Sequence, residues 1–214
     1  NSLKKIPNLI NLLKAGKSIA LVSDAGMPSI CDPGENLINI AKSNNLNIVC
    51  IPGPSAVLTA LVTSGMPSSK FIFEGFLPKK RTEREKILSG INKNEKTTIL
   101  FESPYRLKNL LNELKEFIGG ERKIQVSREL TKKFEEHVGN NINEVIEYFD
   151  SENVIGEITI VLKGINKNRD LNLYKFSMKK DLNDLINAGL SLSAASKYLA
   201  KKNGVKKSEI YNLL

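Results

Sequence analysis

Blocks of apolar and polar positions alternate along the chain and predict helices and strands in turn. The apolar run Ile19–Val22 ends abruptly in a polar loop, and Ile48–Ile51 repeats this arrangement before Pro52 and Gly53. Uninterrupted apolar runs of this length are typical of parallel strands that are buried on both faces. Strands are therefore expected at 18–22 and 47–51, and apolar residues at helical spacing predict helices at 2–15, 35–43 and 55–64.

The same alternation continues after Gly65–Ser69, a segment that is the expected domain junction. Ser103 followed by Pro104 predicts a helix start, because serine caps the first N–H groups and proline suits the first helical position. Further strands are expected at 70–75, 97–101, 123–127 and 158–163, and further helices at 82–89, 103–118 and 142–149. Alternation of this kind favours a parallel sheet. The chain is thus predicted to be α/β, with one domain at 1–66 and a second at 67–164.

The C-terminal residues follow a different pattern, with three short amphipathic helices expected at 178–188, 191–202 and 206–214. They follow a polar linker at 165–173 and predict a small helical domain at 174–214, shaped like a helix-turn-helix. Such bundles often serve only as packing elements, so DNA binding does not follow from the shape. No run approaches the roughly 18–20 apolar residues of a membrane span, and no membrane contact is expected.

The net charge of the chain is +9, with an isoelectric point near 9.4, which favours a polyanionic partner. Most of this charge comes from lysine, and solubility alone accounts for it equally well. Cys31 and Cys50 lack metal-ligand spacing, and His137 is the single histidine, so we expect reduced thiols and no metal. These features predict a cytoplasmic protein.

The loops that follow the first two predicted strands are the strongest candidate for a ligand site. Ligands of open α/β sheets bind at the carboxyl ends of the strands, where such loops lie. Asp24 can accept hydrogen bonds there or offset a cationic charge, and Gly26 allows a positive φ or a close backbone approach. Ser55 and Ala56 begin a helix whose first N–H groups would point into the same site. A turn or helix-capping role is the alternative for Asp24, Ser55 and Asp32.

Five motifs occur in order along the chain: VSDAGMPSICDPG, IPGPSAV, FEGFLPKK, FESPYRL and SRELTKKFEE. Taken together, they resemble the ribosomal RNA small subunit methyltransferase I family, within the tetrapyrrole methylase superfamily. The resemblance covers 2–164 and continues weakly into the helical tail. It implies two α/β domains with S-adenosylmethionine bound in the cleft between them, and a homodimer. The implied reaction is 2′-O-methylation of a cytidine in the 16S RNA of the small ribosomal subunit.

The resemblance also implies roles for individual residues. The cofactor would contact Asp24, Gly26, Met27, Ser55, Ala56 and Phe101, although a phenylalanine of the core would look the same as one lining a pocket. Charged residues at two predicted strand ends would orient the ribose hydroxyl or accept its proton, and the candidates are Glu102, Arg128 and Glu129. The alternative for them is an Arg–Glu pair that only locks the loops. The basic residues expected to contact RNA phosphates are Lys79, Lys80, Arg81, Arg84 and Arg106.

The chain departs from the family pattern in several places. Met27 stands where threonine is usual, Cys31 where serine is common, and Tyr105 where histidine is frequent. Family members begin with a strand, a Gly-rich loop and an acidic segment before the first helix of this chain, so we expect an incomplete cofactor-binding half. The alternative functions are a methylase of a tetrapyrrole or of another small substrate, such as the diphthamide precursor, and a truncated, non-catalytic RNA-binding or dimerising module. The basic patch and the helical tail argue against a small anionic substrate.

Overall fold

The structure is a computed structural model that describes residues 3–165, 178–203 and 205–214. The chain forms two compact units, Asn1–Gly164 and Ile165–Leu214, each of which is described by itself. The predicted division of the first unit after residue 66 stays a prediction. The predicted linker at 165–173 falls almost entirely outside the described residues.

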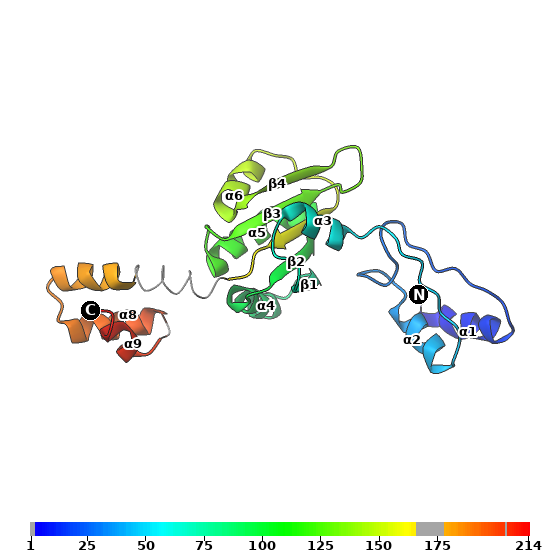
Figure 1. The fold of residues 1–214 in the computed structure, drawn as a ribbon, viewed down its shortest axis with the longest axis horizontal. Helices are drawn as coiled ribbons and strands as arrows, with labels where there is room; N and C mark the ends of the chain where they lie inside the picture. The colour runs from blue at the N-terminus through cyan, green and yellow to red at the C-terminus, as the bar shows by residue number, and fades with distance from the viewer. Residues whose placement is uncertain (1–2, 166–177, 204) are drawn as a thin grey trace. The chain divides into compact units, whose positions relative to one another are not determined.

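A five-stranded sheet forms the centre of the first unit (Figure 1). In spatial order, the strands are β1 (Phe71–Phe76), β2 (Thr97–Glu102), β5 (Ile158–Leu162), β3 (Lys123–Arg128) and β4 (Glu136–Asn141). Only β1 and β2 pair in parallel, and the other three pairings are antiparallel. The expectation of a parallel sheet is therefore wrong for this part of the chain. Because β5 lies antiparallel between β2 and β3, the strands β1, β2 and β3 nevertheless run in the same direction and end at one edge of the sheet.

The largest hydrophobic core lies between one face of this sheet and three helices, α4 (Arg81–Lys93), α5 (Pro104–Ile118) and α6 (Ile142–Asp150). Successive side chains of a strand point to opposite faces, so Leu100 and Ile160 face this core while their neighbours face away. Both are fully buried, and each such side chain contributes about 1.5–3 kcal/mol through its removal from water. This core fixes the positions of the strand ends.

Helix α3 (Ala56–Ser64) packs on the opposite face of the sheet. Leu61 of α3 contributes to a second, smaller core with Ile99 of β2 and Val161 of β5. The side chain of Ser55 caps this helix, and Gly65 ends it with a φ of +59°. The helix predicted at 55–64 is thereby confirmed, and its first turn is held against the sheet.

The N-terminal residues contain helices but no strands in the part of the chain that the structure describes. They form a short 3-10 helix η1 (Leu3–Lys5), followed by α1 (Ile6–Lys14) and α2 (Glu35–Ser43). The strands predicted at 18–22 and 47–51 are wrong, and Val22 and Ile51 are 80% and 79% exposed. An apolar run becomes a strand only where a neighbour completes its backbone hydrogen bonds, and no described segment pairs with either run.

The second unit is a small helical bundle, as predicted. Its described elements are a helix at 178–187, α8 (Leu192–Asn203) and α9 (Lys207–Tyr211), which is shorter than the expected 206–214. Leu182, Leu199 and Ile210 are buried together at its centre. None of the described helices combines the length and the apolar character that a membrane span requires.

Candidate functional site

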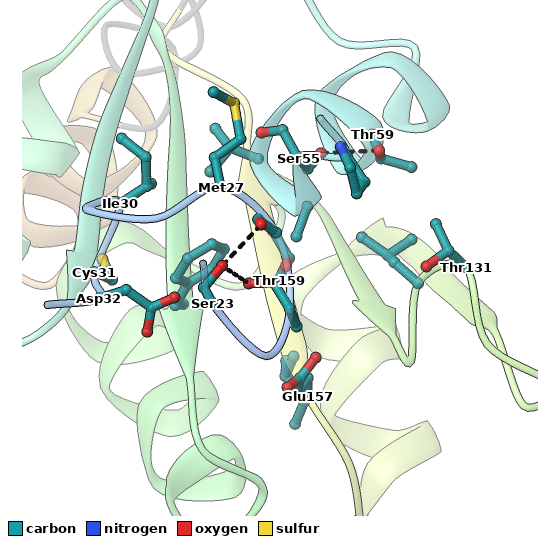
Figure 2. Close-up of a pocket in the computed structure, with 18 of the residues that line it drawn as sticks. Ser23, Met27, Ile30, Cys31, Asp32, Ser55, Thr59, Thr131, Glu157 and Thr159 are labelled. Atoms are coloured by element: carbon teal, nitrogen blue, oxygen red, sulfur yellow. Dashed lines mark hydrogen bonds between the residues drawn. The ribbon is translucent and has the colours of Figure 1, made fainter. Parts of the chain in front are cut away.

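A pocket of about 770 Å³ lies at the edge of the sheet where β1, β2 and β3 end and β5 begins. Its walls come from the loop 23–32, from the start of α3, and from residues at these strand ends. Figure 2 shows Met27 beside Ser55 on one side, and Thr131 and Glu157 on strand-end loops. The site therefore lies where the sequence pattern predicts ligand binding in an α/β fold.

The two N-terminal loops meet at the pocket although the strands predicted before them are not formed. Gly26 has a φ of +72°, and a Cβ atom placed on it would lie 3.8 Å from the carbonyl oxygen of Pro54. The hydroxyl of Ser23 donates a hydrogen bond of 2.9 Å to the carbonyl oxygen of Gly26 and closes the turn (Figure 2). Gly26 thus has the positive φ that the sequence analysis allows for it, and it lies next to the second loop.

The same loop also packs against the sheet. Gly75 of β1 has a φ of +63°, and a Cβ atom on it would lie only 2.9 Å from the sulfur of Cys31. The pairing of β1 with β2 shifts register between Phe73 and Gly75, which is typical of a bulge. A glycine at this position therefore allows the loop to approach the strand. Cys31 and Cys50 are both free and exposed, and no disulfide joins them.

The start of α3 forms the second wall. The hydroxyl oxygen of Ser55 accepts a hydrogen bond of 3.4 Å from the backbone N–H of Leu58, and Ser55 also lines the pocket. The two interpretations of Ser55, as a helix cap and as a pocket residue, are therefore compatible. Ala56 lines the pocket beside it, and the first N–H groups of a helix have no acceptor within the helix. This wall is suited to an anionic group of a ligand.

Aromatic rings form the apolar wall. Phe101, near the end of β2, lines the pocket and is also packed against the smaller core. Its ring centroid lies 5.6 Å from that of Phe76 and 4.9 Å from that of Phe73. Phe76 lines the pocket as well and is 52% exposed, although the sequence analysis does not single it out. Rings in this arrangement offer a surface for a planar, weakly polar group.

Glu102 lines the pocket but is tied into a network of buried charges. One carboxylate oxygen accepts hydrogen bonds of 2.8 Å from the backbone N–H of Ser103 and from Nε of Arg106. The other oxygen has no hydrogen-bond partner among the described residues, and a guanidinium nitrogen of Arg84 lies 3.6 Å from it. Arg84 also donates a hydrogen bond of 2.5 Å to Glu113. Arg84 and Arg106, which we expect to bind RNA, are therefore engaged within the protein, and they hold the end of β2 in place.

Arg128 and Glu129, at the end of β3, do not line the pocket themselves, although Lys132 and Glu157, which bind Glu129, do. The carboxylate of Glu129 accepts hydrogen bonds of 2.9 Å from the backbone N–H of Glu157 and from the ammonium group of Lys132. These bonds hold the pKa of Glu129 below its usual value, the backbone bond contributing most. Arg128 pairs with Glu136 at 2.9 Å. The contacts of Glu129 and Arg128 hold these loops in place, which agrees with the alternative interpretation that such pairs only fix the loops. A catalytic role for Arg128 and Glu129 stays a prediction.

The basic segment 79–81 follows β1 and lies on the surface. Lys80 pairs with Glu83 at 3.0 Å, and Arg81 pairs with Glu85 at 2.7 Å. Exposed pairs of this kind contribute about 0–1 kcal/mol, so they leave the cations available for a stronger anion. Lys79 is part of no ion pair among the described residues. These three residues are exposed and are not bound to a buried carboxylate, as Arg84 and Arg106 are, so they are the more available for an external phosphate.

Comparison with known proteins identifies the family. A profile of the tetrapyrrole (corrin/porphyrin) methylases matches residues 4–146. The ribosomal RNA small subunit methyltransferase I of Synechocystis sp. is 37% identical over 205 residues, which is 96% of this chain and 74% of that protein. The protein of the same name from Thermotoga maritima is 43% identical over 164 residues, which is 77% of this chain and 73% of that protein. The chain belongs to the ribosomal RNA small subunit methyltransferase I family.

Solved structures agree with this assignment in fold. The methyltransferase CobJ superimposes with a TM-score of 0.57 at 18% identity, covering 76% of this chain and 71% of that chain. The cobalt precorrin-4 methyltransferase CbiF gives a TM-score of 0.54 at 15% identity, covering 74% of this chain and 69% of that chain. The predicted fold class, α/β of the tetrapyrrole methylase type with a helical tail, is confirmed. The chain is accordingly a methyltransferase of the S-adenosylmethionine-dependent class.

The residues of the pocket fit S-adenosylmethionine. The volume of about 770 Å³ is within the usual range of small-molecule sites. Asp24 lines the pocket and makes no hydrogen bond or ion pair within the described ranges, so its carboxylate is available to an ammonium or hydroxyl group. The N-terminus of α3 suits a carboxylate, and the rings of Phe76 and Phe101 suit an aromatic base. Acceptors, donors and apolar surface are thus all present.

Several polar residues that line the pocket are given no role by the sequence analysis, among them Thr131, Lys132, Glu157 and Thr159. Thr131 and Lys132 come shortly after the predicted polar residues Arg128 and Glu129 at the end of β3, so the same polar pattern could have indicated them. The other two lie where β5 begins. The insertion of β5 between β2 and β3 brings its start to the pocket edge, and nothing in the local pattern predicts that insertion.

Proposed function

We propose that this protein transfers a methyl group from S-adenosylmethionine to the 2′-oxygen of a cytidine ribose in the 16S RNA of the small ribosomal subunit. The proposal is supported by relatives named ribosomal RNA small subunit methyltransferase I, at 37% and 43% identity. The observation that carries it in the structure is a pocket suited to the methyl donor, whose lining residue Phe76 is followed closely in sequence by the exposed basic segment 79–81. A polyanionic substrate would be held at this segment.

S-adenosylmethionine, when bound, supplies a methyl group already activated by its attachment to a positively charged sulfur. The main contribution of the protein is then to align the donor and the ribose hydroxyl for in-line displacement. Asp24 and the start of α3 would hold polar groups of the donor, since they offer an acceptor and a set of N–H donors. Such alignment alone contributes several powers of ten to a rate.

Glu102 is the predicted catalytic residue that lies at the pocket. Its second carboxylate oxygen has no hydrogen-bond partner in the described part of the chain and would accept a hydrogen bond from the ribose hydroxyl. The guanidinium groups of Arg84 and Arg106 hold this carboxylate in a fixed position at the pocket, which suits it to align a hydroxyl group. We therefore assign Glu102 the orientation of the hydroxyl rather than the removal of its proton.

The decisive experiment is methyl transfer from labelled S-adenosylmethionine to small ribosomal subunits that lack the modification, followed by mapping of the labelled nucleotide. Label on the 2′-oxygen of one cytidine is the expected outcome. Label on a base would refute the proposed chemistry, and label on a free tetrapyrrole with none on RNA would favour a small-molecule methylase. Calorimetry with the donor alone separates an enzyme from a non-catalytic module, because a module without a donor site would show no heat of binding.

The proposed function also predicts the cellular location and the oligomeric state of the protein. Assembled ribosomal subunits lie in the cytoplasm, so the protein would act there. A homodimer is expected from the family resemblance, and sedimentation equilibrium of the full chain would test it, since a monomer at all concentrations would contradict it.

A further inference from the structure

Three exposed aromatic residues surround the pocket, and the proposed function does not yet use them as a group. Phe76, Tyr105 and Phe134 are 52%, 93% and 69% exposed. Tyr105 is more exposed than any other large apolar or aromatic side chain among the described residues. Aromatic rings left in water at neighbouring positions are typical of interaction sites rather than of ordinary surface. We call these three residues the strand-end aromatics.

The topology of the sheet brings the strand-end aromatics to one edge. Phe76 is the last residue of β1, Tyr105 lies in the first turn of α5 just after β2, and Phe134 lies in the loop between β3 and β4. Strands β1, β2 and β3 run in the same direction, so their following residues share an edge. The strand ends that precede Tyr105 and Phe134 are separated by β5, a distance of about 10 Å at the usual strand spacing.

This edge is the edge of the pocket. Phe76 lines the pocket itself. Ser103 and Pro104, which directly precede Tyr105, also line it, and so does Lys132, two residues before Phe134. Rings placed here would meet the parts of a substrate that extend out of the pocket on both sides.

Rigid backbone carries the two most exposed rings. Arg106, the neighbour of Tyr105, is bound to the buried carboxylate of Glu102 at 2.6 Å, which anchors the first turn of α5. The carboxylate of Glu135, next to Phe134, accepts a hydrogen bond of 2.5 Å from the backbone N–H of Thr131 and thus closes the loop. Since these supports are already in place, little conformational entropy is lost when a partner covers the rings.

Cations accompany the rings. The ammonium group of Lys133 lies 5.6 Å from the ring centroid of Phe134. The exposed basic segment 79–81 follows Phe76 after two residues. Aromatic faces interleaved with lysine and arginine are the combination by which proteins hold single-stranded nucleic acid, stacking the bases and neutralising the phosphates. A purely apolar protein partner would gain nothing from these charges.

We infer that Tyr105 and Phe134 stack on unpaired bases of the RNA on the two sides of the nucleotide in the pocket, while Lys79 and Lys133 contact the adjoining phosphates. The inference rests on the proposed function and extends it from the identity of the reaction to the form of the substrate. The enzyme would recognise an RNA segment whose bases are unstacked and accessible. A continuous duplex would not fit, because its bases are covered by their neighbours.

The test uses the full chain and compares Tyr105→Ala, Phe134→Ala and the conservative Tyr105→Phe. Base stacking on one ring is typically lost with a roughly 5- to 100-fold weaker affinity, so each alanine variant should raise the KM for small subunits in that range with little change in kcat. Tyr105→Phe should keep the original KM, because the ring remains, whereas Tyr105→Leu should behave as the alanine variant does. Phe71→Ala is the matched control, since Phe71 begins β1 at the opposite edge of the sheet and is 37% exposed.

A direct binding measurement separates this inference from the proposed function. A single-stranded RNA oligonucleotide carrying 2-aminopurine should bind the original protein and lose fluorescence on stacking, and Tyr105→Ala should weaken both effects. The same sequence as a duplex should bind far less tightly. This outcome would support the inference even if no methyl transfer to RNA were found. The inference is wrong if the alanine variants match Phe71→Ala, if leucine replaces tyrosine without loss, or if the variants change the oligomeric state instead of the affinity for RNA.

Discussion

Two apolar segments of similar composition differ in structure, because one is a buried strand and the other forms no strand. The run Ile158–Leu162 is β5, and all five of its residues are buried between β2 and β3. The run Ile48–Ile51 forms no strand, and Val49 and Ile51 are 72% and 79% exposed. Both consist of β-branched and apolar residues, so their intrinsic preference for a strand is the same. What differs is the neighbour, because β5 has a partner on each side and the N-terminal run has none among the described residues.

The pocket accordingly has one rigid side, at the strand ends, and one side that depends on loop packing. The strand ends are fixed by a large core and by buried charges. The loop 23–32 is held instead by turns and by its contact with Gly75. Mutations on the rigid side should therefore lower the stability of the protein, whereas mutations on the loop side should lower the affinity for the donor and leave stability unchanged.

The largest effect is expected from breaking the buried charge network with Arg84→Gln. The side chain of Arg84 is 8% exposed, and its partner Glu102 is fully buried. Removing one partner of a buried pair typically lowers the free energy of unfolding by about 3–5 kcal/mol, and this change removes the cation nearest to one oxygen of Glu102. Urea unfolding measures this. Arg81→Gln is the control, since Arg81 is 88% exposed and should change stability by less than about 1 kcal/mol. Equal effects of the two changes would contradict the rigid network.

Ile160→Ala and Ile51→Ala test the comparison of the two apolar runs directly. Ile160 is fully buried, and removing its side chain should lower the free energy of unfolding by about 2–5 kcal/mol. Ile51 is 79% exposed, and the same change should stay within about 0.5 kcal/mol. Thermal or urea unfolding of the two variants gives the difference. A comparable loss at Ile51 would mean that residues 48–51 are paired as a strand in solution.

Asp24→Ala tests the loop side of the pocket. Hydrogen bonds to a charged group typically contribute about 1.5–3 kcal/mol, so the affinity for S-adenosylmethionine should fall roughly 10- to 100-fold in calorimetry. The stability should not change, because Asp24 makes no hydrogen bond or ion pair inside the part of the chain described here. Glu35→Ala, in the first turn of α2, is a control of equal charge in the same region. Unchanged affinity in the Asp24 variant would remove this residue from the site.

The smallest effect concerns the loop between β3 and β4. Hydrogen bonds from the backbone N–H of Glu157 and from Lys132 hold the pKa of Glu129 below its usual value of about 4.5. A lowered pKa in the folded state means that this contribution is complete above the unfolded value and is lost as the pH falls below about 4.5. Glu129→Gln should thus be less stable than the original protein at neutral pH, and the gap should close in acid. A gap that is independent of pH would show that the charge of Glu129 contributes nothing.

Much of the region 70–162 can be predicted from local patterns. The strands β1, β2, β3 and β5 and the helices α5 and α6 appear within a few residues of their expected bounds, because alternation and capping signals lie within each element. Strand β4 cannot be found in this way, since Val138 is its only large apolar side chain. It forms because all six of its residues pair with β3, a contact that no local pattern encodes.

The predicted residues of the candidate site also fall into two groups, those that line the pocket as predicted and those that are bound inside the protein. Asp24, Gly26, Ser55 and Phe101 are predicted from the sequence, and all four line the pocket. Arg84 and Arg106 look equally available for RNA in the sequence, yet both are bound to Glu102 in the interior. Whether a charged side chain reaches solvent depends on helix packing around it, and the motif FESPYRL does not contain that information.

The alternation of helices and strands, the cap of α3, the start of α5 at Pro104 and the family all follow from the sequence alone, because each depends on residues close together in the chain. Only the tertiary structure decided that β5 enters between β2 and β3, that the runs at 18–22 and 47–51 remain unpaired, and that Tyr105 is left exposed beside the pocket. The physical reason is that strand pairing and burial depend on partners far away in sequence. A sequence pattern indicates which secondary structure a segment favours, but its packing and pairing partners determine whether that structure forms.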